Sequence, residues 1–196
     1  MNICIFGAAS SRIDALYIKE VEDLAEKLGR RGHNLVFGGG GNGLMGAAAR
    51  GMHKGGGKVY GVIPKFFRKE RIEEIYEQCD RFFYTDTMAS RKAKMEELSD
   101  AFIVTPGGIG TFEEFFEVLT LKQLGRHKKP IAVYNINGYY YGIMALIHNG
   151  IEESFLRENC QMLYKVFEED EDNNVIAYVE AGEDIESFNV RDVKYG

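Results

Sequence analysis

Cysteine is scarce in this chain. Its 196 residues include only Cys4, Cys79 and Cys160, and no two of them have the close spacing of a zinc-ligand or redox pair. Four histidines are scattered along the chain, and none pairs with another at metal-ligand spacing. We therefore expect reduced thiols, no metal site and a cytoplasmic location.

Long apolar runs and an excess of basic residues are also missing. No stretch approaches the roughly 20 apolar residues of a membrane-spanning helix. The first apolar run, Ile3 to Phe6, is too short for a signal peptide and lacks a basic leader. The net charge is −6, which argues against a general nucleic-acid binder. A nucleotide remains compatible with this charge, because a few backbone N–H groups can hold a phosphate. We expect no membrane and no nucleic-acid partner.

Short apolar runs alternate with longer amphipathic ones, a pattern typical of a parallel sheet covered by helices. The predicted strands are Asn2–Phe6, Asn34–Phe37, Lys58–Ile63, Arg81–Thr85, Ala101–Thr105, Ile131–Tyr134 and Leu163–Phe167. The predicted helices are Asp14–Arg30, Gly43–His53, Met88–Leu98, Thr111–Leu124, Tyr139–Glu153 and Asp170–Glu180. The charged stretch Lys65–Asp80 is predicted to be loop with a short helix. The fold class is therefore α/β, a Rossmann-like doubly wound and mostly parallel sheet of about six or seven strands flanked by helices.

The length favours a single domain, at roughly 100–200 residues per domain. We place this domain at residues 1–182 and interpret the polar residues 183–196 as a C-terminal tail.

Three glycine-rich turns follow predicted strands, at Gly7–Ser10, Gly38–Gly43 and Pro106–Thr111. Doubly wound sheets bind ligands at the carboxyl ends of their strands, and glycine lets the backbone approach a phosphate. None of the three is a Walker A loop, and the second matches only part of a dinucleotide fingerprint. Each turn alone could equally be a tight strand-to-helix connection.

The third turn allows two interpretations. Thr111 and Glu114 have the spacing of a capping box, in which both side chains would cap their own helix. Alternatively, the turn holds a phosphate while Glu114 acts on the substrate. Glu114 lies away from the apolar stripe of its predicted helix, so it faces either solvent or a site.

Arg91 and Lys92 lie near the start of the predicted helix Met88–Leu98. Cations are unfavourable at this end of a helix dipole, so an anionic ligand could offset them. The alternative is a pair of exposed surface cations.

Together these residues resemble the Lonely Guy family of cytokinin-activating phosphoribohydrolases, long labelled lysine decarboxylases. The resemblance covers about residues 2 to 170. It is carried by the following motifs: Pro-Gly-Gly-x-Gly-Thr-x-x-Glu at 106–114, Arg91-Lys92, Gly-Gly-Gly-x-x-Gly-Leu-Met-Gly at 38–46, Gly-Val-Ile-Pro at 61–64, Gln-Leu-Gly-x-His-Lys-Lys-Pro at 123–130 and Asn-Gly-Tyr-Tyr at 137–140.

The resemblance implies hydrolysis of AMP and N6-modified AMP to free base and ribose 5-phosphate by a homodimer or larger assembly. It implies that Arg91 and Glu114 are catalytic. It places these residues at substrate contacts: Glu73, Lys92, Gly108, Ile109, Gly110, Thr111, Phe112, Glu113 and Thr120. We expect Gly107, Gly108, Gly110 and Thr111 to hold the 5′-phosphate through backbone N–H groups, and Gly39 and Gly40 to contact the substrate.

In this hypothesis Glu114 binds the ribose hydroxyls, stabilises an oxocarbenium-like sugar and positions water, while Arg91 steadies the departing base. No cofactor or metal is required. Two departures from the family, Ala89-Ser90 for His-Glu and Gly7-Ala8-Ala9 for a serine-rich turn, leave the choice of base open. A lysine decarboxylase using pyridoxal phosphate and a non-catalytic nucleotide or molybdenum-cofactor binding protein are the alternatives.

Overall fold

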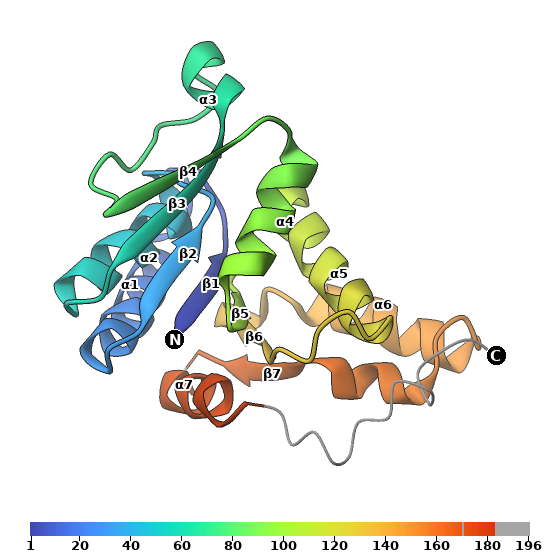
Figure 1. The fold of residues 1–196 in the computed structure, drawn as a ribbon. Coiled ribbons are helices and arrows are strands. Elements are labelled where there is room, and N and C mark those ends of the chain that lie inside the picture. Colours follow the sequence, from blue (N-terminus) through green and yellow to red (C-terminus); the bar gives the residue numbers. More distant parts are fainter. Residues whose placement is uncertain (170, 183–196) are drawn as a thin grey trace.

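The computed structural model describes residues 1–169 and 171–182. Seven strands form one sheet in the order β4-β3-β2-β1-β5-β6-β7, and all neighbouring strands are parallel (Figure 1). The strands are β1 (Asn2–Phe6), β2 (Asn34–Phe37), β3 (Val59–Pro64), β4 (Arg81–Thr85), β5 (Ala101–Val104), β6 (Ile131–Asn135) and β7 (Lys165–Glu168). The predicted α/β fold class is confirmed. The predicted tail at 183–196 lies outside the described residues.

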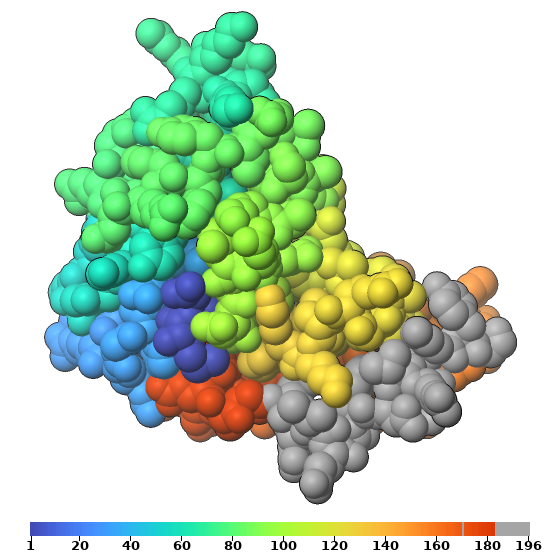
Figure 2. Space-filling model, in the orientation of Figure 1, coloured from blue at the N-terminus to red at the C-terminus, as the bar shows by residue number. Residues whose placement is uncertain are grey.

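Helices cover both faces of the sheet. They are α1 (Ala15–Arg30), α2 (Gly43–Lys54), α3 (Lys65–Glu70), α4 (Met88–Leu98), α5 (Ile109–Gln123), α6 (Tyr141–Glu152) and α7 (Asp172–Ala181), with short 3-10 helices η1 (Ile136–Gly138) and η2 (Glu158–Leu163). Helices α1, α2 and α7 share one apolar cluster with the sheet, and α4, α5 and α6 share the other. Figure 2 shows the green β4–α4 region and the yellow end of α5 across the front of the molecule.

The central strands read as continuous apolar runs because both of their faces are covered. All four residues of β5 and four of the five in β1 are buried, as expected for parallel strands between two helical layers. The strand order reverses between β1 and β5, since β2 to β4 extend from one side and β6 and β7 from the other. Ligands of open α/β sheets bind at such a reversal.

Glycines let α1 and α2 approach closely. A Cβ atom on Gly51 would lie only 2.1 Å from the carbonyl oxygen of Glu22, and one on Gly55 would lie 2.2 Å from that of Glu26. Both obstacles are backbone atoms of α1, which cannot move aside as a side chain would.

We expect Gly51→Ala to lower the free energy of unfolding by about 1–3 kcal/mol, the usual cost of overpacking a tight core. Urea denaturation followed by circular dichroism measures this change. Gly142→Ala in α6 is the matched control, because its Cβ would meet no atom within 4 Å. Equal stability of the two variants would contradict the close packing of α1 on α2.

Candidate active site

A cavity of about 230 Å³ opens at the reversal of strand order, where β1 and β5 end. The loop after β1, the start of α5, one residue of α4 and the segment after β3 all contribute to its wall. Its lining consists of Gly7, Ala8, Ala9, Met45, Phe67, Glu73, Arg91, Gly108, Gly110, Thr111 and Glu114. The cavity thus brings together both predicted catalytic residues and four of the predicted substrate contacts.

The start of α5 faces this cavity with free backbone donors. The helix begins at Ile109, its N-cap is Gly108, and no side chain caps it. The first N–H groups of an α-helix have no acceptor within the helix and carry its positive dipole end. A Cβ on Gly108 or Gly110 would meet nothing within 4 Å. The absence of side chains at Gly108 and Gly110 is therefore not required by packing, and it leaves the backbone accessible from the cavity.

The capping-box interpretation of Thr111 and Glu114 is wrong. The helix begins two residues before Thr111, so Thr111 lies inside the first turn and cannot be the N-cap. Its side chain is buried against Gly107, where an added Cβ would come within 2.1 Å of the Thr111 hydroxyl. Gly107 is thus required by packing, and Glu114 is not folded back to cap its own helix.

Arg91 is buried in a cradle of backbone carbonyls. Its Nε donates to the carbonyl oxygen of Val62 at 3.2 Å, and its Nη2 donates to that of Gly38 at 3.1 Å. The guanidinium also lies over the ring of Phe67, 5.4 Å from the ring centre. These contacts fix the guanidinium and leave Nη1 directed toward Glu114, whose Oε1 is 3.9 Å away. The interpretation of Arg91 as an exposed surface cation is wrong.

Glu114 is largely buried, with 12% of its side chain exposed. Burial raises the pKa of its carboxyl to about 7, while the Arg91 guanidinium acts in the opposite direction; the charges of Glu113 and Glu73 raise it further. An acid with a pKa near neutrality, in a cavity beside a specific charged partner, is typical of a catalytic group.

Glu73 reaches the same cavity from the segment after α3. Its Oε1 is buried without a hydrogen-bond partner, and burial raises the pKa of this carboxyl. The segment is fixed to the second glycine turn, because Gly41 N–H donates to Glu74 and Tyr76 N–H donates to Gly39, at 2.7 and 2.8 Å. Gly39 and Gly40 do not line the cavity. The second turn instead holds Arg91 and the segment that carries Glu73.

Besides Gly39, Gly40 and Gly107, five further predicted contacts lie away from the cavity lining: Ile109, Lys92, Phe112, Glu113 and Thr120. The side chain of Ile109 is 85% exposed, and Thr120 is exposed on the outer side of α5. Phe112 packs against the rings of Tyr139 and Tyr140. Lys92 and Glu113 form an ion pair between α4 and α5.

Met45 and Phe67 were missing from the predicted site residues. Met45 belongs to the glycine-rich motif at 38–46, but the motif alone does not indicate that its side chain lines the cavity. Phe67 falls in the charged stretch that the sequence left ambiguous. The one signal in the sequence that Phe67 belongs to the site is its position shortly after Pro64, where β3 ends. Ligands of open α/β sheets bind at the carboxyl ends of the strands.

Ser90, one of the two departures from the family pattern, has a structural role. Thr87 is the N-cap of α4, and its side chain accepts from the Ser90 N–H while the Ser90 hydroxyl accepts from the Thr87 N–H. This reciprocal capping box fixes the start of the helix that carries Arg91.

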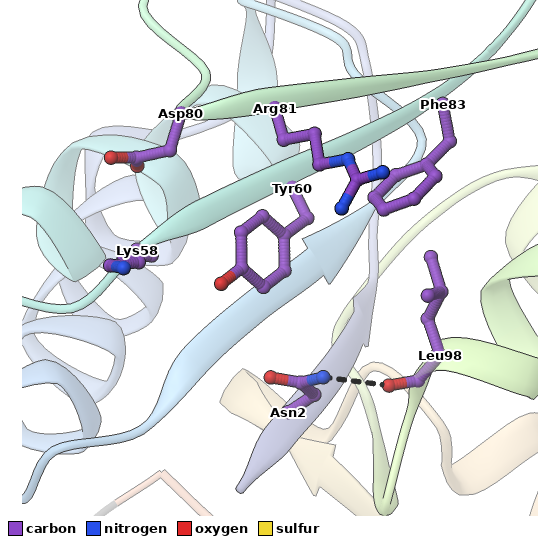
Figure 3. A pocket seen from close by; sticks show the side chains of 7 residues that line it. All are labelled: Asn2, Lys58, Tyr60, Asp80, Arg81, Phe83 and Leu98. Atoms are coloured by element: carbon purple, nitrogen blue, oxygen red, sulfur yellow. Dashed lines mark hydrogen bonds between the residues drawn. The ribbon is translucent and has the colours of Figure 1, made fainter.

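Further hollows lie outside this cavity, and two of them have volumes of about 230 and 520 Å³. The smaller one is mostly apolar, adjoins the cavity across Ala8 and Gly108 and is lined by Tyr17 and Tyr139. The larger one lies where β1, β3 and β4 begin (Figure 3). Figure 3 shows the guanidinium of Arg81 beside the ring of Phe83. The guanidinium carbon lies 4.5 Å from the ring centre. This second hollow is at the amino ends of the strands and contains no predicted site residue.

Within residues 1–169 and 171–182, no cluster of three or more His, Cys, Asp or Glu side chains is arranged to hold a metal ion. In the same ranges, no helix combines the length and the apolar character needed to cross a membrane. The three cysteines are free thiols.

Comparison with solved structures supports the fold. The molybdenum cofactor carrier protein of Chlamydomonas reinhardtii is 19% identical, with a TM-score of 0.67 over 92% of this chain and 98% of that one. The molybdenum cofactor binding protein of Rippkaea orientalis is 18% identical, with a TM-score of 0.66 over 90% and 94%. At this identity the likeness concerns the fold alone.

Comparison of sequences is more specific. The family model described as "Possible lysine decarboxylase" matches residues 45–178. The probable cytokinin riboside 5′-monophosphate phosphoribohydrolase LOG6 of Arabidopsis thaliana is 42% identical over 79% of this chain and 76% of its own. LOG2 of the same plant is 38% identical over 83% and 75%, and the probable enzyme LOGL3 of rice (Oryza sativa subsp. japonica) is 40% identical over 82% and 75%. The chain therefore belongs to the family of LOG-type cytokinin riboside 5′-monophosphate phosphoribohydrolases.

Proposed function

We propose that the chain hydrolyses the N-glycosidic bond of AMP and N6-modified AMP, releasing the purine base and ribose 5-phosphate. The observation that carries this proposal is the pair formed by Arg91 and Glu114, 3.9 Å apart in the cavity that the uncapped start of α5 also faces. A carboxyl, a guanidinium and a phosphate site are the groups that this reaction needs.

The 5′-phosphate binds at the start of α5. Free N–H groups and the positive end of the helix dipole favour an anion there. Gly108 and Gly110 leave the backbone accessible to phosphate oxygens. Glu114 lies on the same helix, about one turn further along, so a phosphate held at the helix start brings the ribose toward the carboxylate. Phosphate binding thereby orients the reacting bond.

Glu114 and Arg91 act on opposite charges of the transition state. Cleavage of the bond leaves positive charge on the sugar and negative charge on the departing base. The Glu114 carboxylate stabilises the sugar cation and orients the attacking water. The N–H groups of Arg91 that do not bond to the backbone stabilise the charge that develops on the base. Backbone carbonyls accept from Nε and Nη2, so Arg91 is already in place before the substrate arrives.

Pyridoxal phosphate, the cofactor implied by a lysine decarboxylase, does not fit this cavity. That cofactor forms a Schiff base with a lysine, and no lysine is part of the cavity lining. Lys92 is the lysine nearest to Arg91 in the sequence, and its ammonium group is held by Glu113 and Glu117.

Incubation with AMP and with N6-isopentenyl-AMP, followed by chromatography for free base and ribose 5-phosphate, tests the proposal. We expect stoichiometric release of both products from at least one nucleotide, and the ratio of the two rates identifies the preferred base. Tight AMP binding without product release would instead favour a nucleotide-binding protein.

The pH dependence of the reaction follows from Glu114. The carboxylate is the active form and its pKa is about 7, so kcat/KM is expected to rise as the pH increases through 7 and then to level off.

The stability of the protein should change with pH in the opposite direction. Because its pKa is raised, Glu114 is more easily protonated in the folded protein than in the unfolded chain. The resulting gain in the free energy of unfolding is complete below the ordinary pKa of 4.5 and is lost as the pH rises to about 7. Melting temperatures of wild type and Glu114→Gln between pH 4.5 and 8 measure this, and parallel curves would contradict it.

The enzyme is further proposed to act as a homodimer in the cytoplasm. The outer side of α5 presents Ile109 and Phe116 to solvent, with 85% and 38% of each exposed. Apolar side chains at such a position suit contact with a second copy. Light scattering on the eluting protein measures the mass, and a monomer at micromolar concentration would rule out this surface as a stable interface.

A further inference from the structure

Arg91 and Lys92 of α4 both form ion pairs with carboxylates of α5. Helices α4 and α5 lie side by side (Figure 1). Arg91 and Lys92 are neighbours on α4, and Glu114 and Glu113 are neighbours on α5. Arg91 faces Glu114 inside the cavity, and Lys92 faces Glu113 outside it. The two helices are therefore connected by an inner pair and an outer pair.

The outer pair is much the tighter of the two. Lys92 Nζ donates to Oε1 of Glu113 at 2.8 Å and lies 2.8 Å from Oε2 of Glu117. Glu113 and Glu117 are four residues apart, so they lie on the same face of α5. Only 13% of the Lys92 side chain is exposed. The ammonium group thus binds two points of α5, one turn apart.

The inner pair cannot hold the two helices in position. At 3.9 Å, the distance between Arg91 Nη1 and Glu114 Oε1 exceeds that of a hydrogen bond. Two hydrogen bonds of Arg91 go to carbonyl oxygens of β3 and of the turn after β2, and neither of them reaches α5. Another contact must set the distance between guanidinium and carboxylate.

We infer that Lys92 is a positioning residue, which fixes α5 against α4 through Glu113 and Glu117 and so sets the spacing of Arg91 and Glu114. This inference rests on the proposed function for the reaction concerned. It gives Lys92 a role other than the substrate contact implied by the family resemblance. Its ammonium group is already engaged by two carboxylates and is not part of the cavity wall.

Steady-state kinetics of Lys92→Met, with the nucleotide that the wild type hydrolyses, tests this inference. We expect kcat to fall about 10- to 100-fold, because small displacements of catalytic groups have effects of this size, while KM stays within about twofold. Lys92→Arg should recover most of kcat, since a guanidinium can also bridge two carboxylates. Lys94→Met is the matched control: Lys94 pairs with Glu97 within α4, so kcat should not change.

Exchanging the charges of residues 92 and 113 distinguishes a positioning role of Lys92 from a direct contact with the substrate. Lys92→Glu alone places three carboxylates together and should lower kcat further. Adding Glu113→Lys restores a cation between position 92 and Glu117, so the double variant should be more active than Lys92→Glu. A double variant no more active than Lys92→Glu would overturn the inference.

Binding of ribose 5-phosphate, measured by calorimetry, does not depend on turnover. A positioning residue predicts the same affinity for wild type and Lys92→Met within about twofold. An affinity at least tenfold weaker in Lys92→Met, or an unchanged kcat, would overturn the inference. A wild type that binds ribose 5-phosphate but hydrolyses no nucleotide would instead refute the proposed function, and the calorimetric comparison would still decide the role of Lys92.

Discussion

Glu114→Gln is expected to lower kcat by about 10³-fold, within the usual range for loss of a catalytic acid or base. The amide has nearly the shape of the carboxyl but carries no negative charge to stabilise the sugar cation. KM for the nucleotide should change little, because in the proposed binding mode backbone N–H groups of α5 hold the phosphate. Initial rates of base release at pH 8, where wild-type Glu114 is ionised, measure the effect.

The same variant should be at least as stable as the wild type at that pH. Burial of an ionised carboxylate disfavours folding, as the raised pKa of Glu114 indicates. Glu113→Gln, one residue away but outside the cavity, is the control and should retain much more activity than Glu114→Gln. Similar losses in the two variants would refute the assignment of Glu114 as the catalytic carboxylate.

Gly38→Ala is expected to lower kcat by about 10²-fold while leaving the fold intact. A Cβ at this position would lie 1.7 Å from Nη2 of Arg91 and 2.8 Å from its Cζ. The obstructed group is the end of a long side chain, so the guanidinium moves and the backbone does not. The change would break the hydrogen bond from Arg91 to the Gly38 carbonyl and displace Nη1 from Glu114.

Kinetics and thermal melting together test this expectation. A lowered kcat with a melting temperature within a few degrees of wild type is the expected result. Gly142→Ala, whose Cβ enters open space, controls for the loss of a glycine. Full activity in Gly38→Ala would show that the carbonyl cradle does not determine the position of Arg91.

The sheet and its helices could be predicted because their signals are local. Apolar periodicity, Pro64 and Pro106 placed every described strand to within about two residues. The start of α5 was misplaced because Thr111 and Glu114 satisfy the spacing of a capping box. Packing of Thr111 against Gly107, which sequence spacing does not reveal, takes Thr111 into the helix instead.

The candidate site was only partly predictable because its contacts join distant segments. Arg91 and Glu114 follow from motifs, but the cradle of Arg91 combines Gly38, Val62 and Phe67 from three separate turns and strands. No local pattern encodes these contacts. A single motif also does not indicate toward which side each of its side chains points. Arg91 and Lys92 are adjacent in sequence, yet Arg91 faces the cavity and Lys92 does not.

The carbonyl cradle of Arg91 has a consequence for how such an enzyme can diversify. Every residue type has a backbone carbonyl, so the guanidinium position is insulated from most changes of side chain at position 62. The neighbouring wall residues Met45 and Phe67, by contrast, contribute side chains to the cavity. Mutation at these two positions can therefore reshape the cavity while the anchoring oxygens stay in place. Substrate preference and catalytic competence are separable in this architecture, which favours gradual drift from one purine nucleotide to another without an inactive intermediate.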